Sequence, residues 1–155
     1  MLNEIDIMRA VDHENVIKLY EVYETEKSIY LVLELIQGKS LQEMLKKQAF
    51  KEENSEIKII NTARSILDAL AYLSSKGVMH RDLKPDNILI DKGDKVKIVD
   101  FGLATFIDVP EYIFKKCGTP GYIAPEVFKY DPKTPATSYD GHCDVFSIGC
   151  IIYYM

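Results

Sequence analysis

Charged and polar side chains gather in one short stretch of the chain, "HRDLKPDNILI", which runs from His80 to Ile90 beside apolar segments. A carboxylate, an ammonium group and an amide lie there within six positions: Asp82, Lys84 and Asn87. Phosphoryl transfer needs all three, because a carboxylate orients the acceptor hydroxyl and takes its proton, a fixed cation stabilises the charge on the transferring group, and oxygen ligands hold Mg²⁺. The stretch therefore predicts Asp82 as a base, Lys84 as a phosphate contact and Asn87 as a metal ligand.

A second carboxylate follows an apolar run farther along the chain. In "VKIVDFGLA", Asp100 comes directly after the run, and Gly102 frees the backbone just beyond it. Carboxylate and amide oxygens are both ligands that Mg²⁺ accepts. We therefore expect Asp100 to hold the metal ion together with Asn87.

The elements that must position these side chains follow from the periods of the apolar residues. Runs of β-branched and aromatic residues predict an antiparallel hairpin from 16–24 and 28–36, and two short strands at 87–90 and 96–99 joined by the turn "DKGD". The stretch 100–139 has no period and is expected to be irregular.

Helical periods account for most of the remaining residues. The predicted helices cover residues 2–11, 40–48, 54–75 and 144–155. Asn54 or Ser55 can cap the start of the long third helix, and Gly77 suits a left-handed cap at its end. Its apolar stripe comprises Ile57, Ile60, Ala63, Ile66, Leu67, Leu70 and Leu73. The first helix lacks an N-cap and the last lacks a C-cap, so we expect the chain to be a piece of a larger domain.

Composition limits the kinds of partner. The 155 residues are 47% hydrophobic and 28% charged, with a formal net charge of −5, which suits one globular domain and argues against nucleic acid or an anionic membrane as a bulk partner. No apolar run reaches the ~20 residues of a membrane helix, and acids at the start exclude a signal peptide. Three cysteines without metal-ligand spacing indicate reduced thiols. Reduced thiols favour a cytoplasmic protein, with a nuclear location as the alternative.

Three motifs occur in order along the chain: "HRDLKPDN", "DFG" and "GTPGYIAPE". Together they resemble the motif set of the eukaryotic protein kinases, and "KP" with "GTPGY" is similar to the serine/threonine branch. The sequence as a whole resembles calcium/calmodulin-dependent and related kinases. This resemblance implies a bilobal, protein-kinase-like α+β fold in partial form. Residues 1–36 would be the C-terminal part of the small lobe with the hinge, and residues 37–155 the truncated, mainly helical large lobe.

By this resemblance the protein would bind ATP and Mg²⁺ and phosphorylate serine or threonine in a protein or peptide. Asp82 would be the catalytic base, Lys84 the phosphate contact, and Thr119 would bridge the two. Asn87 and Asp100 would hold Mg²⁺. The other implied nucleotide residues are Glu4, as partner of the ATP-binding lysine, Leu33, Glu34 and Ile36 at the gatekeeper and hinge, and Leu89 under the adenine ring.

The resemblance also implies a column of side chains that links the two lobes. Its members would be Met8, Leu19, His80 and Phe101, with Asp144 as the anchor. These residues could equally form an ordinary core. Their functional meaning would lie only in the dependence of the column's geometry on where the side chain of Phe101 points.

Two departures from the family pattern concern the extent of the chain. No Gly-rich phosphate loop precedes Glu4, and no "VAIK"-type lysine lies upstream of it. The arginine that would pair with Glu126 would lie beyond Met155. We expect a fragment or an incomplete gene model that is inactive alone. The alternative is a truncated protein that binds partners without catalysis.

A third departure concerns control. Arg81 precedes the catalytic aspartate, and such kinases often need an activation-loop phosphate to pair with that arginine. The usual acceptor position holds Lys115, and the nearest hydroxyl on that side belongs to Tyr112. Either Lys115 points to solvent, or activity is independent of phosphorylation there and Asp108 or Glu111 neutralises Arg81. A flanking regulatory domain or a calcium sensor outside this chain would then supply control.

Substrate preference is weakly encoded. The positions that favour arginine before the phosphosite correspond to Ser40, Asp86 and Tyr154, and only Asp86 is acidic. A strong preference for basic substrates is therefore not expected.

Three functions remain in competition at this point. The first is a serine/threonine protein kinase. The second is a pseudokinase-like scaffold, which the retention of Asp82 and Asp100 disfavours. The third is a small-molecule kinase, which "GTPGYIAPE" disfavours because that motif shapes a peptide groove.

Overall fold

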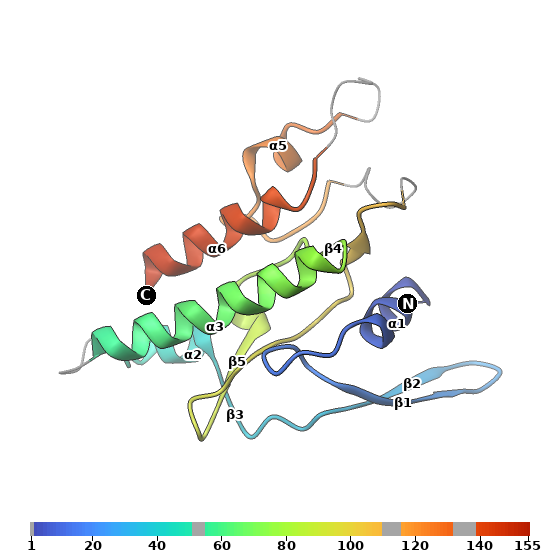
Figure 1. Cartoon of the computed structure of the whole chain (residues 1–155), viewed down its shortest axis with the longest axis horizontal. Coiled ribbons are helices and arrows are strands. Elements are labelled where there is room, and N and C mark those ends of the chain that lie inside the picture. The colour runs from blue at the N-terminus through green and yellow to red at the C-terminus, as the bar shows by residue number, and fades with distance from the viewer. Residues whose placement is uncertain (1, 51–54, 110–115, 132–138) are drawn as a thin grey trace.

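The structure is a computed structural model, and it describes residues 2–50, 55–109, 116–131 and 139–155 (Figure 1). The helices are α1 (Leu2–Ala10), α2 (Leu41–Lys46), α3 (Ser55–Ser75), the 3₁₀ turn η1 (Pro85–Asn87), α5 (Pro125–Phe128) and α6 (His142–Tyr154). The strands are β1 (Leu19–Glu24), β2 (Ile29–Leu33), β3 (Gly38–Ser40), β4 (Val78–Met79), β5 (Ile88–Asp91), β6 (Val96–Ile98) and β7 (Thr105–Phe106). This mixture of helices and small antiparallel sheets confirms the predicted α+β class.

The predicted N-terminal hairpin is present but shorter than expected. β1 pairs antiparallel with β2, with Tyr23 opposite Tyr30. Residues 16 and 17 lie outside the hairpin and instead meet the second sheet, where Val16 forms a parallel bridge to Ile98 and the Ile17 N–H donates to the Ile98 carbonyl at 2.9 Å. The chain between α1 and the hairpin is thereby attached to β6. The Lys18 carbonyl still accepts from the Glu34 N–H at the base of the hairpin.

The second sheet holds the two strands predicted around the first motif. β5 lies between β3 and β6, and both pairings are antiparallel. The strands β3, β4 and β7 were not predicted, because strands of two or three residues are too short to show a period of two.

Helix α3 corrects the predicted apolar stripe. Thr62, Ile66, Ala69, Leu70 and Leu73 are its buried residues. In contrast, the exposed fractions are 63% for Ile57, 52% for Ile60 and 45% for Leu67. At about 100° per residue, Ile57 lies opposite Ile66 on the helix, so the seven apolar residues wind around α3 and only part of them can face one core.

The ends of α3 follow from local chemistry. Gly77 adopts a left-handed φ of +66°, as predicted for the cap, and its N–H donates to the Ser74 carbonyl at 2.9 Å. Ser55 is the first helical residue, while Asn54 lies outside the described residues. The last helix, α6, begins at His142 rather than at residue 144.

A large core joins α1, α3, the second sheet and α6, and a smaller cluster lies between α5 and α6. Figure 1 shows α3 and α6 as the two longest helices, running side by side. Within the described parts of 100–139, β7 and α5 interrupt the predicted irregular chain. Lys115, Tyr112 and Glu111 lie outside the described residues. In those parts of the chain that the structure describes, no helix is both long and apolar enough to span a bilayer.

Candidate active site

Three side chains of the predicted site form a closed hydrogen-bonded triangle. The Lys84 ammonium donates to Asp82 Oδ2 at 2.8 Å and to Thr119 Oγ1 at 2.9 Å. The Thr119 hydroxyl donates to Asp82 Oδ1 at 2.6 Å. Both carboxylate oxygens of Asp82 are thus oriented by groups that come from two separate segments of the chain.

Asn87 closes the other side of the loop. Its amide donates to the Asp82 carbonyl at 2.9 Å and to Asp82 Oδ2 at 3.3 Å. Asn87 ends η1, where Pro85 suits the first turn, and its own carbonyl accepts from the Val99 N–H at 3.0 Å. Asn87 is therefore held beside the residue that precedes Asp100.

The backbone ahead of Asp82 is anchored on α6. Asp144 accepts from the N–H groups of His80, at 2.6 Å, and Arg81, at 2.8 Å, and is only 1% exposed. Burial raises the pKa of Asp144, and these two N–H donors oppose the rise. This anchoring role of Asp144 was implied by the sequence resemblance.

The ring of His80 has one tautomer in this arrangement. Its Nδ1 accepts from the Asp82 N–H at 3.3 Å, so Nε2 carries the hydrogen and donates to the Val99 carbonyl at 3.1 Å. The ring is fully buried, with its centroid 5.0 Å from that of Phe101. Met8 and Phe101 belong to the same buried core, and Leu19 packs against it. Met8, Leu19 and Phe101 of the predicted column thus lie in or against one core, while the role of the column stays a prediction.

Two residues of the site adopt strained backbone conformations. Arg81 has φ of +65° and Asp100 has φ of +66°, both in the left-handed region that non-glycine residues rarely adopt. Strain of this kind persists only where surrounding contacts hold it, and it concentrates at functional sites. Gly118 meets a different constraint, since a Cβ there would approach the Arg81 carbonyl to 2.9 Å.

The charge of Lys84 is stabilised by its surroundings. The hydrogen bond to Asp82 is the largest cause that raises the pKa of Lys84 above its ordinary value, and the nearby carboxylates of Asp100 and Asp86 add to it. Lys84 therefore keeps its positive charge at every pH at which a kinase-type reaction is measured.

Asn87 and Asp100 offer the oxygen ligands that Mg²⁺ prefers. Asp100 is exposed, and its Oδ1 accepts from the Gly102 N–H at 3.3 Å. Among the residues that the structure describes, no group of three or more His, Cys, Asp or Glu side chains could hold a metal ion. One carboxylate and one amide fit Mg²⁺ all the same, because this ion usually takes one or two protein ligands and completes its shell with phosphates and water.

Glu34, one of the residues predicted at the nucleotide, forms an ion pair with β6. It directly follows β2, and its carboxylate accepts from Lys97 Nζ at 2.7 Å and from the Lys18 N–H at 3.3 Å. Lys97 belongs to β6, the strand that precedes Asp100, so this ion pair ties the predicted hinge to that strand. The sequence did not indicate this pair.

The other predicted nucleotide residues lie on α1, β2, β5 and the segment that follows β2. Leu33 ends β2 with its side chain exposed, Ile36 is half-buried in the following segment, and Leu89 is half-buried in β5 opposite Ser40 and Lys97. Glu4 is half-buried on α1. The structure brings Asp82, Lys84, Asn87 and Thr119 into direct contact, while the roles of all the site residues remain predictions.

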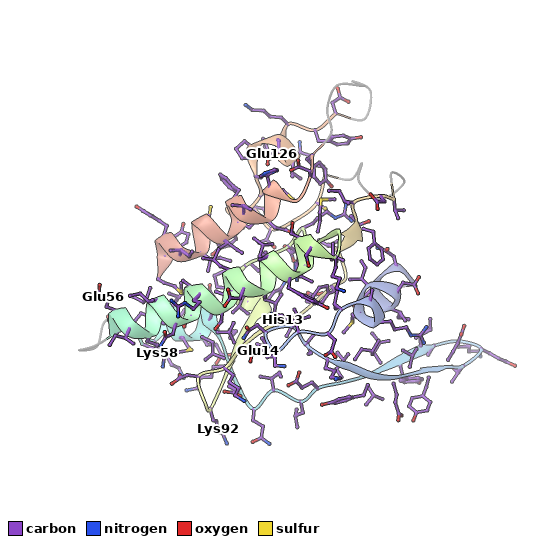
Figure 2. All side chains as sticks on the ribbon, in the orientation of Figure 1. His13, Glu14, Glu56, Lys58, Lys92 and Glu126 are labelled. Atoms are coloured by element: carbon purple, nitrogen blue, oxygen red, sulfur yellow. The ribbon has the colours of Figure 1, made fainter. Side chains whose placement is uncertain are left out.

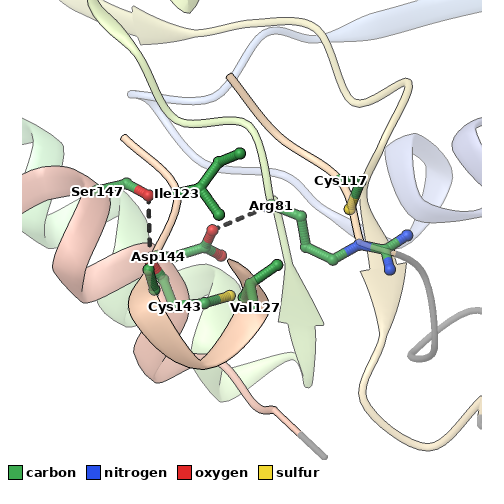
Figure 3. Close-up of a pocket in the computed structure, with 8 residues that line it drawn as sticks. Arg81, Cys117, Ile123, Val127, Cys143, Asp144 and Ser147 are labelled. Carbon is green, nitrogen blue, oxygen red and sulfur yellow. Dashed lines mark hydrogen bonds between the residues drawn. The ribbon is translucent and has the colours of Figure 1, made fainter. Parts of the chain in front are cut away.

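The side chain of Arg81 has partners that were not predicted. Its Nε donates to the Leu103 carbonyl at 2.7 Å, and one terminal nitrogen donates to the Tyr139 hydroxyl at 3.0 Å. Burial raises the pKa of Tyr139 to about 12, and Arg81 opposes this rise. Figure 3 shows Arg81 passing between Cys117 and Val127 at a cavity of about 10 Å³, which is too small for more than one water molecule.

Comparison with known proteins points in one direction. The profile of the protein kinase domain matches residues 1–155. A probable myosin light chain kinase of Dictyostelium discoideum is 40% identical over 158 residues, which cover 100% of this chain and 48% of that protein. Sperm motility kinase 3A of Mus musculus is 38% identical over 156 residues, covering 100% of this chain and 29% of that protein.

A third relative comes from another organism. Calcium-dependent protein kinase 5 of Plasmodium berghei is 43% identical over 155 residues, which cover 98% of this chain and 26% of that protein. The chain thus spans between about a quarter and a half of the length of these relatives.

Proposed function

Because this chain belongs to the eukaryotic protein kinase family, and has its α+β fold, we propose that the protein containing it is a serine/threonine protein kinase. It transfers the γ-phosphoryl group of ATP to a hydroxyl group of a protein or peptide. The observation that carries this proposal is the triangle of Asp82, Lys84 and Thr119, beside Asn87.

The triangle suits the acceptor side of the reaction. A substrate hydroxyl beside Asp82 gives its proton to the carboxylate as its oxygen bonds to the γ-phosphorus, and the bond from that phosphorus to the bridging oxygen breaks to release ADP. Thr119 and Asn87 keep the Asp82 carboxylate in position, which matters because small displacements of a reacting group are costly.

Lys84 suits the donor side. Its ammonium lies between Asp82 and Thr119, where a permanent positive charge stabilises negative charge on the transferring phosphoryl group. Asn87 and Asp100 would hold Mg²⁺, which supplies charge neutralisation at the phosphates. Glu34 and Ile36 would present hinge backbone groups to adenine, with Leu33 as gatekeeper, Leu89 below the ring and Glu4 paired with the ATP-binding lysine.

The extent of the chain bears on activity. Residues 1–155 contain no G-x-G-x-x-G sequence, and this loop covers the phosphates in protein kinases. We therefore propose that residues 1–36 form the C-terminal part of the small lobe with the hinge, and that residues 37–155 form part of the large lobe. We also propose that residues 1–155 alone have no kinase activity. Regulation by a calcium sensor belongs to the same proposal, supported by the relative named as calcium-dependent. A cytoplasmic location is proposed from the three cysteines without metal-ligand spacing.

The test uses the full-length protein and three peptides that differ only in the acceptor: serine, threonine or tyrosine. We expect phosphorylation of the serine and threonine peptides and not of the tyrosine peptide. Asp82→Asn should lower the rate by about 100-fold or more, and Asp100→Asn should abolish it while Mg²⁺ is kept at millimolar concentration.

The matched control is Asp68→Asn, which removes an exposed carboxylate on α3 that is not a partner of the triangle residues. If the full-length protein phosphorylates none of the three peptides, or if Asp82→Asn and Asp68→Asn behave alike, the catalytic assignment is wrong. A non-catalytic scaffold is then the better description.

A further inference from the structure

A second cavity lies away from the catalytic triangle. It has a volume of about 430 Å³ and is lined by β3, the C-terminal end of α2, the first turn of α3 and the turn between β5 and β6. Cavities that bind ligands usually have volumes of about 300–1,000 Å³. Asp82, Lys84, Asn87 and Thr119 are not among the residues that line it.

Lysines from four different elements surround this cavity. Its charged lining residues are Lys39, Lys47, Lys58, Lys92, Asp91 and Asp94. Figure 2 shows Lys58 on the first turns of α3 and Lys92 at the tip of the β5–β6 turn. Four lysines against two aspartates leave the lining with a formal charge of +2, although the chain as a whole carries −5.

Both aspartates of the lining are engaged by the fold itself. Asp91 Oδ1 accepts from the Gly93 N–H at 2.7 Å and the Lys95 N–H at 2.9 Å, and the pKa of Asp91 is lowered chiefly by these backbone donors. Asp94 forms an ion pair with Lys58 at 3.0 Å. Lys39, Lys47 and Lys92 therefore remain as the ammonium groups that the cavity offers to a ligand.

Apart from Gln37 and Gly38, the rest of the lining is apolar. Met44 and Ile90 are buried core residues, and Ala49 packs against the same core. An apolar surface ringed by ammonium groups suits a ligand with carboxylates around an aliphatic side chain. Lysine pairs with such carboxylates as a point charge, and spacing the lysines over several elements suits several carboxylates better than one small anion.

Nucleic acid fits this lining less well than peptide. None of the described lining residues is aromatic, so the cavity offers no surface on which a base could stack. We propose that this cavity, here called the lysine cavity, is a docking site for an acidic peptide segment of another protein, with an aliphatic residue among its glutamates or aspartates.

The proposal is tested by binding, so it can fail or succeed independently of the proposed kinase activity. The probe is a fluorescein-labelled peptide of glutamates around one leucine, and its anisotropy is measured with the full-length protein. The cavity variant is Lys47→Glu with Lys92→Glu. The control variant is Lys46→Glu with Lys95→Glu, because these lysines are exposed neighbours on the same two segments but do not line the cavity.

The two variants change the net charge equally, so general electrostatic attraction falls equally in both. We expect the cavity variant to weaken peptide binding by about tenfold or more, which corresponds to about 1.4 kcal/mol, and the control variant to change it by less than about twofold. Replacing the leucine of the peptide by glycine should also weaken binding. Unfolding midpoints of both variants are compared with that of the parent protein to establish that each is folded.

Four results would overturn the proposal. The first is that the parent protein does not bind the peptide. The second is that the cavity variant and the control variant lose peptide binding to the same extent. A third is displacement of the peptide by RNA at concentrations at which unlabelled peptide has no effect. The fourth is a dimer of the parent protein that the cavity variant alone converts to monomer, which would make a second copy the occupant.

Discussion

The hydroxyl group of Thr119 connects the two charged side chains of the proposed reaction. It donates to Asp82 and accepts from Lys84, although it lies more than thirty positions away in the sequence, at separations of 37 and 35 residues. Asp82 and Lys84 are two positions apart and could contact each other without it. The contribution of Thr119 is therefore to fix the direction of the carboxylate rather than to bring the charges together.

We expect Thr119→Ala to lower kcat of the full-length protein by about tenfold to a hundredfold, because the Asp82 carboxylate loses the side-chain donor to its Oδ1, one of its three orienting contacts. Thr119→Ser keeps the hydroxyl and should retain most of the rate. The measurement is steady-state phosphorylation of the serine peptide, with kcat and KM for ATP separated. An equal loss in the serine and alanine variants would show that packing of the methyl group, not the hydrogen bonds, is what matters.

Tyr139 provides a test of charge at the residue scale. Burial raises its pKa from the ordinary value of 10.0 to about 12, so the folded protein keeps this proton where the unfolded chain has lost it. Because the folded state binds more protons between these two values, the stabilisation is complete below pH 10 and is lost as the pH rises towards 12.

We expect the parent protein to lose more unfolding free energy than Tyr139→Phe between about pH 9 and about pH 11, since the phenylalanine variant cannot ionise. The measurement is urea unfolding of both proteins at each pH, so that lysine titration cancels in the comparison. Parallel losses in the two proteins would contradict the raised pKa.

At the scale of elements, α6 helps to position the loop that carries Asp82. Its first turn contacts the loop through Asp144, and this contact holds the strained Arg81 backbone in the left-handed region. Ser147, one turn later, donates to the Tyr122 carbonyl at 2.7 Å and so attaches the segment that carries Thr119 to the same helix. One helix thus positions both halves of the triangle.

We expect Asp144→Ala to destabilise the protein by about 2–5 kcal/mol, because the buried N–H groups of His80 and Arg81 lose their acceptor. Asp144→Asn keeps one acceptor oxygen and should cost about half as much. Urea unfolding of the full-length protein measures both. Values within about 0.5 kcal/mol of the parent for both variants would mean that the loop is held by other contacts.

At the scale of the whole molecule, apolar side chains remain uncovered on the two longest helices. The exposed fractions are 63% for Ile57 on α3, and 87% for Tyr153 and 61% for Tyr154 on α6. A cavity of about 350 Å³ lies beside the tyrosines, lined by Phe146, Cys150 and neighbouring residues. Exposed apolar surface of this extent favours association.

We expect residues 1–155, prepared alone, to associate with rising concentration, as measured by light scattering after gel filtration. Ile57→Ser with Tyr153→Ser should reduce association. Tyr20→Ser with Tyr23→Ser is the control, since these tyrosines are also exposed but lie on the β1–β2 hairpin. A monomer with a sharp, cooperative unfolding transition would be the contrary result.

The sequence by itself determined the residues of the candidate site and most of the elements. Asp82, Lys84 and Asn87 lie close together because only a few peptide bonds separate them, and the hairpins and long helices follow from apolar periods that act over neighbouring residues. The α+β fold class and the kinase family followed from the order of three local motifs. The apolar stripe of α3 shows the limit, because a period predicts which residues share a helix face but not how much of that face another element covers.

Only the tertiary structure decided the contacts between residues far apart in the chain. The Tyr139 hydroxyl at Arg81, the Glu34–Lys97 ion pair and the lysine cavity join segments separated by tens of residues. The left-handed backbone of Arg81 is likewise held by a distant group, the carboxylate of Asp144. Such contacts depend on the path of the whole chain, and the residue types involved are common on any protein surface, so no local pattern distinguishes them before the chain has folded.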